Sequence, residues 1–368
     1  MEVLFRTDSS IQIGSGHVMR CLTLAEGLKK KGASCKFICR DHEGNLISLI
    51  EEKGFKAIIL KTPKIKNIKF SPKNNSSLCY SEWLGVPWEI DAKQTNDLII
   101  GLNIDWLIVD HYALDSRWEN AVTGNIDKVM IIDDLADRNH NCDLLLDQNL
   151  GKNQSDYYSL TPADCNILVG PKFALLRPEF SDMRPYSLDR RREPRLKNIL
   201  ISMGGIDKDN ITSKVLDSLE SCNLPIDCEI NVLLGSNSPW IKELKRKASA
   251  MSWETNLKLN ISNIAEEMSD SDIAIGAAGS TSWERCCLGL PSLVLVIADN
   301  QLNIAKALSA QGAAQVINIK FLENELHELF LNHQDLYEKM KKISSSSQEL
   351  TMGNGTDIVI DLMHSFTK

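Results

Sequence analysis

The stretch Arg6-Thr-Asp-Ser-Ser-Ile-Gln-Ile-Gly14-Ser-Gly16-His17-Val-Met-Arg20 decides the fold of this 368-residue chain. A short apolar run before it, residues 3–5, predicts a strand, and the apolar spacing from residue 16 onward predicts an amphipathic helix. A strand, a glycine turn and a helix in this order are typical of α/β sheets, which bind ligands at the carboxyl ends of their strands. The turn directs backbone N–H groups toward such a ligand, which favours an anion. The candidate binding residues of this stretch are Arg6, Asp8, Gly14, Gly16 and Arg20.

His17 is the candidate catalytic residue of the same stretch. A positive charge is disfavoured at the start of a helix, and Arg20 follows one turn later, so we expect an uncharged imidazole. An uncharged imidazole can act as a general base, whereas the alternative is a solvated histidine that only caps the helix. The stretch lacks the third glycine of a dinucleotide-binding fingerprint, so a nicotinamide cofactor is not expected.

Composition argues against several classes of protein. The net charge of −8 provides no general field for a nucleic acid, and the hydrophobic content of 43% is that of a packed globular protein. We find no secretory signal and no membrane-spanning stretch, so a cytoplasmic protein without a membrane partner is expected. The ten cysteines lack metal-ligand spacing, so neither a metal nor a cofactor is expected. The absence of repeats and heptads favours a monomer.

Strand-like runs alternate with helical patterns along the whole chain, which predicts an α/β fold with parallel sheets. A Pro- and Arg-rich segment, 171–195, is predicted as a linker between two Rossmann-like domains, 1–170 and 196–368. The last helix, 357–366, can pack back on the first domain. Two similar halves imply an interdomain cleft faced by the strand ends of both sheets. The expected strands are 3–5, 35–39, 57–60, 106–109, 129–132, 167–169, 198–203, 229–234, 257–261, 273–276, 293–297 and 315–319.

The polar, irregular segment 61–97 interrupts this alternation. It is either a disordered insertion or a loop that covers a substrate or contacts a partner. Its stretch Trp83-Leu-Gly-Val-Pro-Trp88 favours the loop, because two exposed tryptophans are unfavourable in water.

The second half carries a nucleotide-binding pattern. Gly276-Ala-Ala-Gly279-Ser280-Thr281-Ser-Trp-Glu284 follows a predicted strand and opens a helix. Small residues let the backbone approach phosphates, the two hydroxyls are donors, and Glu284 can accept hydrogen bonds from a ribose diol. A similar glycine turn, Gly204-Gly205, follows the strand at 198–203. Together these features favour a nucleoside diphosphate, although Glu284 alone is also compatible with a helix-capping role.

The order of these motifs, followed by Gly289-Leu-Pro291 and Ala298-Asp-Asn-Gln301-x-Asn303, resembles the two-domain GT-B fold of the MurG transferases. The chain is more similar still to the UDP-2,4-diacetamido-2,4,6-trideoxy-β-L-altropyranose hydrolases of pseudaminic acid biosynthesis, the PseG family. The matching phrases are the stretch from Arg6 to Leu22, Trp83-Leu-Gly-Val, Asp110-His-Tyr-Ala-Leu-Asp and Ile132-Asp-Asp-Leu-Ala-Asp-Arg-Asn-His.

The resemblance implies that His17 activates water. By the pattern of the transferases, the backbone near Ile261 meets the uracil edge and Glu284 meets the ribose. The diphosphate is then expected at Gly205, Gly279, Ser280, Thr281 and Gln301, with Gly204, Ala278 and Asn303 as further binding residues.

The implied reaction is hydrolysis of a UDP-linked sugar to UDP and free 2,4-diacetamido-2,4,6-trideoxy-L-altrose. Water attacks the anomeric carbon with inversion and without a metal ion. Because UDP is a good leaving group, one base and a positive environment for the diphosphate suffice. Attack on phosphorus is the alternative chemistry. A UDP-sugar-dependent GT-B glycosyltransferase and a non-catalytic UDP-sugar-binding protein are the alternative functions.

Further polar residues follow predicted strands of the first half. Asp110, His111 and Tyr112 are predicted sugar contacts, and His111 is an alternative base. Asp8 either orients His17, binds a sugar hydroxyl or only shapes the turn. Asp133 and Asp134 are interpreted as loop or cap residues rather than as metal ligands.

Overall fold

A computed structural model describes residues 1–62, 80–122, 124–236 and 238–366. The chain folds into two compact units, and each has its own sheet and core. Unit 1 comprises Met1–Leu175 together with Thr356–Lys368, and unit 2 comprises Leu176–Gly355. Among the described residues, no helix is both long and apolar enough to span a bilayer.

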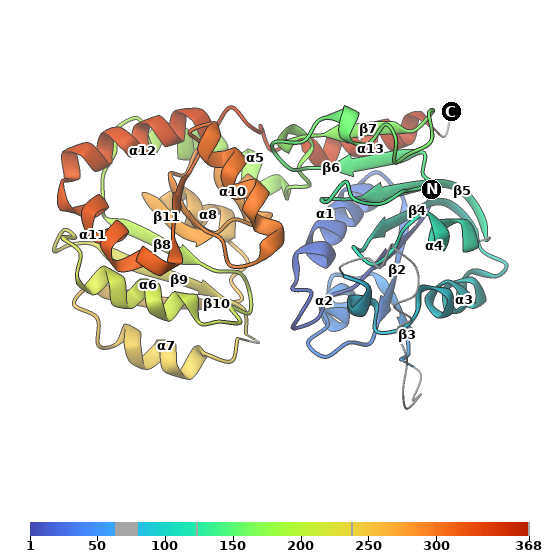
Figure 1. Ribbon diagram of the computed structural model, residues 1–368, viewed down its shortest axis with the longest axis horizontal. Coiled ribbons are helices and arrows are strands. Elements are labelled where there is room, and N and C mark those ends of the chain that lie inside the picture. Colours follow the sequence, from blue (N-terminus) through green and yellow to red (C-terminus); the bar gives the residue numbers. More distant parts are fainter. Residues whose placement is uncertain (63–79, 123, 237, 367–368) are drawn as a thin grey trace. The chain divides into compact units, whose positions relative to one another are not determined.

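Unit 1 is a seven-stranded parallel sheet in the order β3-β2-β1-β4-β5-β6-β7 (Figure 1). The order reverses direction between the neighbours β1 and β4, which is where open α/β sheets bind ligands. The strands are β1 (Glu2–Thr7), β2 (Ser34–Arg40), β3 (Lys56–Leu60), β4 (Asn103–Asp110), β5 (Asn125–Ile132), β6 (Leu144–Asp147) and β7 (Asn166–Val169). The helices are α1 (Gly16–Lys30), α2 (Ile47–Glu52), α3 (Trp88–Ile99), α4 (Ser116–Ala121) and α13 (Gly355–Ser365).

Alternation along the strands builds a core on each face of this sheet. Val3 and Phe5 pack with α1, α2 and α13, whereas Leu4 packs with α3 and α4 on the other face. Both faces are therefore covered, which explains why the central strands are nearly continuous apolar runs.

Unit 2 is a six-stranded parallel sheet in the order β10-β9-β8-β11-β12-β13, and its order reverses between β8 and β11 (Figure 1). Its strands are β8 (Asn198–Ser202), β9 (Glu229–Leu234), β10 (Glu254–Leu259), β11 (Ile273–Ala277), β12 (Ser292–Leu295) and β13 (Gln315–Ile317). Its helices are α5 (Pro178–Arg190), α6 (Ile211–Glu220), α7 (Ile241–Ala248), α8 (Ile264–Asp270), α9 (Thr281–Cys287), α10 (Leu302–Ala310), α11 (Leu322–Leu331) and α12 (His333–Ser347). Helices α6, α7, α11 and α12 supply apolar side chains to its main core.

The division of the chain differs in detail from the predicted boundaries. The segment 171–195 contains helix α5, whose Arg184 donates to backbone carbonyls of unit 2. Helix α13, at the end of the predicted second domain, belongs to unit 1. Strand β6 was not expected from the sequence. Within 61–97, residues 63–79 lie outside the described part of the chain, and η1 (Ser81–Leu84) and α3 are helical.

Candidate functional site

A hydrogen-bonded pair of side chains, His17 and Asp110, lies where the strand order of unit 1 reverses. His17 is the second residue of α1, and Asp110 is the last residue of β4. The register pairs Asp110 with Thr7 of β1, so the strand ends bring the carboxylate to the start of the helix. Nδ1 of His17 lies 2.6 Å from Oδ1 of Asp110.

Asp110 is completely buried and ionised. Burial opposes its ionisation, but the charge of Arg20 and the hydrogen bonds from Arg20 and His17 outweigh that penalty and hold the pKa of Asp110 well below its usual range. Nε and Nη2 of Arg20 donate to the two carboxylate oxygens, each at 2.7 Å. An ionised carboxylate only accepts hydrogen bonds, so Nδ1 of His17 carries the hydrogen, and in an uncharged ring Nε2 is the basic nitrogen.

A second layer of polar groups lies behind Arg20. Asp134 accepts hydrogen bonds from Nη1 of Arg20 at 3.0 Å, from the Tyr112 hydroxyl at 2.5 Å and from Nδ2 of Asn149 at 2.6 Å. The same Nδ2 also donates to Asp147, at 2.9 Å. Asp110 and Asp134 thereby hold Arg20 in place. Arg20 in turn fixes the orientation of Asp110, the partner of His17.

Asp147 lies at the end of this layer. Burial, reinforced by the charge of Asp134, raises the pKa of Asp147 to about 7. The Tyr157 hydroxyl lies 2.8 Å from Asp147 and 3.1 Å from Asp133. One hydroxyl hydrogen cannot serve two carboxylates at once, and both contacts are satisfied when Asp147 is protonated and donates to the Tyr157 oxygen.

Aromatic rings cover one side of His17. The ring of Tyr112 meets the imidazole edge-on, with 4.6 Å between centroids, and Trp83 stacks on Tyr112 at 5.6 Å. Tyr80 packs against both of these rings. The Trp83 stretch of the 61–97 segment therefore lies against the candidate catalytic residue.

Arg6 and Asp8 form a separate buried ion-pair cluster, so the expectation that they are ligand-binding residues needs correction. Arg6 binds Asp8 and also Asp91 of α3, each with a shortest contact of 2.7 Å. None of the three side chains is exposed to solvent. Asp110, and not Asp8, orients His17.

The remaining predicted residues of unit 1 are distributed around these two clusters. His111 is buried, with Nε2 at 3.3 Å from Asp8, and burial lowers the pKa of its imidazole. Since Asp110 is buried and bonded to His17 and Arg20, the prediction that it contacts a sugar is replaced by an orienting role. Gly14 has a φ of +82°, which a residue with a side chain rarely adopts, and Gly16 begins α1.

In unit 2 the predicted residues all follow strands at the same edge of the sheet. Gly204 and Gly205 follow β8, and Ala278, Gly279 and Ser280 lie between β11 and α9, directly at the reversal point. The remaining residues follow the flanking strands β10 and β12 or belong to α9 and α10, namely Ile261, Thr281, Glu284, Gln301 and Asn303.

The turn after β11 is open to a ligand. Gly279 has no neighbour that a Cβ would crowd, the nearest atom being Nε2 of Gln301 at 3.9 Å. Ser280 is exposed. Burial raises the pKa of Glu284, and the Arg177 guanidinium, at 4.0 Å, opposes that effect. The backbone N–H of Ile297 donates to Oε1 of Gln301 at 3.1 Å, so the amide group of Gln301 is oriented.

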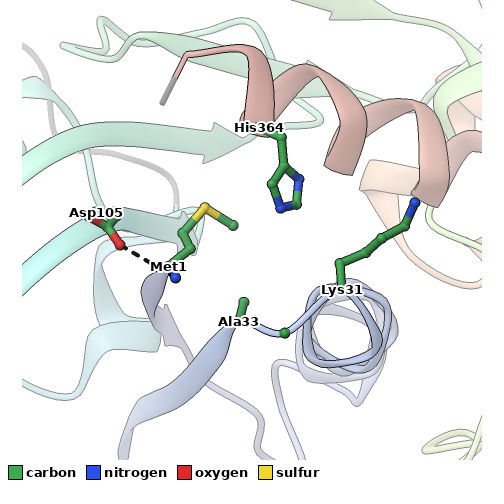
Figure 2. A pocket seen from close by; sticks show the side chains of 6 residues that line it. Met1, Lys31, Ala33, Asp105 and His364 are labelled. Atoms are coloured by element: carbon green, nitrogen blue, oxygen red, sulfur yellow. Dashed lines mark ion pairs between the residues drawn. The ribbon is translucent and has the colours of Figure 1, made fainter. Parts of the chain in front are cut away.

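A pocket of about 260 Å³ lies elsewhere on unit 1 (Figure 2). It is lined by residues near the amino ends of the strands or on the helices beside them, namely Met1, Lys31, Gly32, Ala33, Asp105 and His364. This is the edge opposite to His17, so the pocket is not the candidate site. Among the described residues, no cluster of three or more His, Cys, Asp and Glu side chains could hold a metal ion.

Sequence reasoning missed several members of the polar cluster around Arg20. Asp134 was interpreted as a loop or cap residue, and Asp147 and Asn149 were not considered, because β6 was not expected. Their signal was the run Leu144-Leu-Leu-Asp147-Gln-Asn149, an apolar stretch that ends in polar residues as β4 does.

The comparison with known proteins agrees with the second-half motifs. Residues 199–352 match the model of the glycosyltransferase family 28 C-terminal domain. A UDP-2,4-diacetamido-2,4,6-trideoxy-β-L-altropyranose hydrolase of Campylobacter jejuni is 29% identical over 85% of this chain and 97% of its own length. The predicted resemblance to this hydrolase family is confirmed.

Other relatives extend beyond the length of this chain. An uncharacterized protein of Methanocaldococcus jannaschii is 28% identical in a match that covers 80% of this chain. The same match covers only 55% of that relative. Among solved structures, MurG of Acinetobacter baumannii superposes with a TM-score of 0.68 over 99% of both chains, at 15% identity. At that identity the similarity concerns the fold, which is of the GT-B type with two Rossmann-like α/β units.

Proposed function

We propose that this protein hydrolyses a UDP-linked 2,4-diacetamido-2,4,6-trideoxy sugar in pseudaminic acid biosynthesis. The products are UDP and the free sugar. The observation that carries the proposal is the His17–Asp110 pair, because activation of a water molecule requires an oriented imidazole whose Nε2 can accept a proton. The named Campylobacter relative supplies the substrate class.

The roles of the residues follow from their chemistry. Nε2 of His17 takes a proton from water while the water oxygen bonds to the anomeric carbon on the side opposite UDP. The bond from that carbon to the diphosphate oxygen breaks, and the configuration inverts. Asp110 stabilises the imidazolium that forms, as a carboxylate does in other histidine-based sites. Unit 2 binds the UDP moiety through the turns after β8 and β11, with Glu284 on the ribose.

The direct test is turnover without an acceptor. Purified protein is incubated with UDP-linked diacetamido sugars and UDP release is measured, with the His17→Asn variant as control. We expect release by the wild type and a loss of about 10²–10⁴-fold in the variant. Unchanged turnover by His17→Asn would remove His17 as the base. In ¹⁸O-water, label in the free sugar supports attack on carbon, and label in UMP would refute it.

A glycosyltransferase is the second candidate, favoured by the family 28 match and the MurG-like fold. It would release UDP only after a hydroxyl acceptor is added, so the same assay separates the two functions. The proposed chemistry uses no metal ion, and we therefore expect UDP release to persist in EDTA.

A further inference from the structure

The guanidinium of Arg285 lies directly under the turn that joins β11 to α9. Arg285 is on the inner side of α9 and is 2% exposed. Its Nη2 donates to the carbonyl oxygen of Ala277 at 2.9 Å and to Oγ of Ser282 at 3.0 Å. Nη1 approaches Oγ1 of Thr281 at 3.4 Å. One side chain thus touches both ends of the turn 277–282.

Arg285 is a buried cation whose charge is offset only in part: the neighbouring Glu284 raises the pKa that burial lowers. Among the described residues, no Asp or Glu lies within ion-pair distance of it, and its Nε has no hydrogen-bond partner. The deeply buried arginines of unit 1 differ in this respect, since Arg6, Arg20 and Arg40 each contact aspartates. Burial lowers the pKa of Arg285, which reflects the same unfavourable position. A buried cation without an ion-pair partner is costly to the fold. Arg191 is also buried and binds carbonyl oxygens near the end of α8, whereas Arg285 lies against the turn at the reversal point of the sheet.

The sheet provides space for this side chain. A Cβ at Gly276 would lie 2.7 Å from Nη1 of Arg285 and 2.8 Å from the carbonyl oxygen of Ser202. Gly276 and Ser202 are register partners on β11 and β8, the two strands at the reversal point. A glycine in the strand therefore admits the guanidinium at the place where the sheet binds ligands.

We propose that Arg285 is the positioning residue that makes the 277–282 turn selective for a diphosphate over an uncharged nucleoside. This inference rests on the proposed binding of UDP to unit 2. The guanidinium holds the turn from below and leaves a positive charge beneath it that Glu284 offsets only in part, and a bound diphosphate supplies a further counter-charge. Because a guanidinium only donates hydrogen bonds, the hydroxyls of Thr281 and Ser282 accept from it and direct their own hydrogens elsewhere.

The test compares UDP with uridine on the full-length chain. Affinity for UDP is measured by isothermal titration calorimetry, and affinity for uridine by NMR titration at millimolar ligand, for the wild type, Arg285→Met and Arg285→Lys. We expect Arg285→Met to weaken UDP binding roughly tenfold or more and to leave uridine binding unchanged. Arg285→Lys keeps the charge and should restore most of the UDP affinity. Arg195→Met is the matched control, since it removes a charge just before β8 begins, and should leave UDP binding unchanged.

Two results would overturn the inference while UDP still binds to the wild type. One is an equal loss of UDP and uridine affinity in Arg285→Met, which indicates a structural role alone. The other is no loss at all. If Arg285→Met does not fold, Arg285→Lys decides, because a structural role predicts that both ligands are lost. Failure of the wild type to bind UDP would instead refute the proposed function itself.

Discussion

At the scale of single residues, Asp110 connects the charge of Arg20 with the imidazole of His17. It accepts hydrogen bonds from both nitrogens of one edge of Arg20, and it sets the tautomer of His17. An asparagine in its place can donate to Nδ1, which moves the ring hydrogen to Nε2 and removes the base.

We therefore predict that Asp110→Asn lowers kcat for UDP release by about 10²–10⁴-fold, with a smaller change in KM. Steady-state kinetics with the UDP-sugar checks this. Asp105→Asn is the matched control, because Asp105 lies on the same strand at its other end and is 40% exposed. A variant at Asp110 with normal kcat would show that His17 needs no orienting carboxylate.

Asp147 predicts a pH dependence of stability. Its pKa is about 7 in the folded protein and near 3.8 in the unfolded chain. Between these values the folded state keeps a proton that the unfolded state has lost, so stability falls as pH rises from about 4 to 7. Above the pKa of Asp147 in the folded protein, the stability that its proton contributed is fully lost.

Asp147→Asn should remove this penalty, because the amide imitates the protonated acid. We expect the variant to gain stability relative to the wild type as pH rises from 5 to 8, by about 1–3 kcal/mol at pH 8. Denaturant unfolding at several pH values measures the difference. Asp133→Asn should instead destabilise the protein at pH 7. Arg138 lowers the pKa of Asp133 to about 2 despite burial, so the charged form is the one that the fold stabilises. A constant difference across the pH range would contradict a protonated Asp147.

The same scale explains which site residues could be predicted from the sequence. His17 lies beyond the short strand β1 and Asp110 ends the apolar strand β4, and the order of the sheet brings those strand ends together. Arg6 could not be assigned in this way. It shares the face of β1 that carries Leu4, away from α1, and its partner Asp91 is 85 residues distant in the sequence. Only the packing of α3 shows that the charge of Arg6 is neutralised within the core.

At the scale of elements, hydrophobic periodicity predicted every strand but one. β6 is a run of three leucines and an aspartate without alternation, a pattern that does not by itself distinguish a strand from a buried helix. The predicted linker is partly helical because Pro178 takes the first position of α5, where a missing N–H is tolerated. Some arginines of the predicted linker bind carbonyl groups of unit 2. Arg191, for example, contacts the carbonyls of Met268, Ser269 and Ser271 near the end of α8.

Helix α13 offers a test of packing between distant elements. Val359, Ile360 and Met363 are buried in the core that α1 shares with the sheet. The side chain of Ile360 occupies the space over Gly27. A Cβ placed on Gly27 would lie 2.6 Å from Cδ1 of Ile360. Ile360→Ala should therefore cost about 2–4 kcal/mol of local stability. Hydrogen exchange should show faster opening of α1 and α13 and no change in unit 2. Ile358→Ala is the control, because Ile358 is on the same helix but 37% exposed. Equal effects of both variants would contradict this packing.

At the scale of the whole molecule, the two units differ in how the chain builds them. Unit 2 is continuous, Leu176–Gly355, whereas unit 1 needs the final segment to complete its core. This asymmetry was only partly visible in the sequence. The apolar face of residues 357–366 predicted a packed helix, but periodicity does not identify which sheet a helix covers.

The asymmetry predicts how separate fragments behave. A fragment of residues 176–355 should unfold cooperatively and bind UDP as the full chain does, because its core and its strand-end turns are complete. A fragment of residues 1–175 lacks the side chains of Val359, Ile360 and Met363, so it should expose apolar surface on α1 and melt at lower temperature. Adding a peptide of residues 355–368 should restore part of that stability. Circular dichroism melts and calorimetry check each outcome. An unfolded 176–355 fragment beside a stable 1–175 fragment would show that the final helix does not complete unit 1.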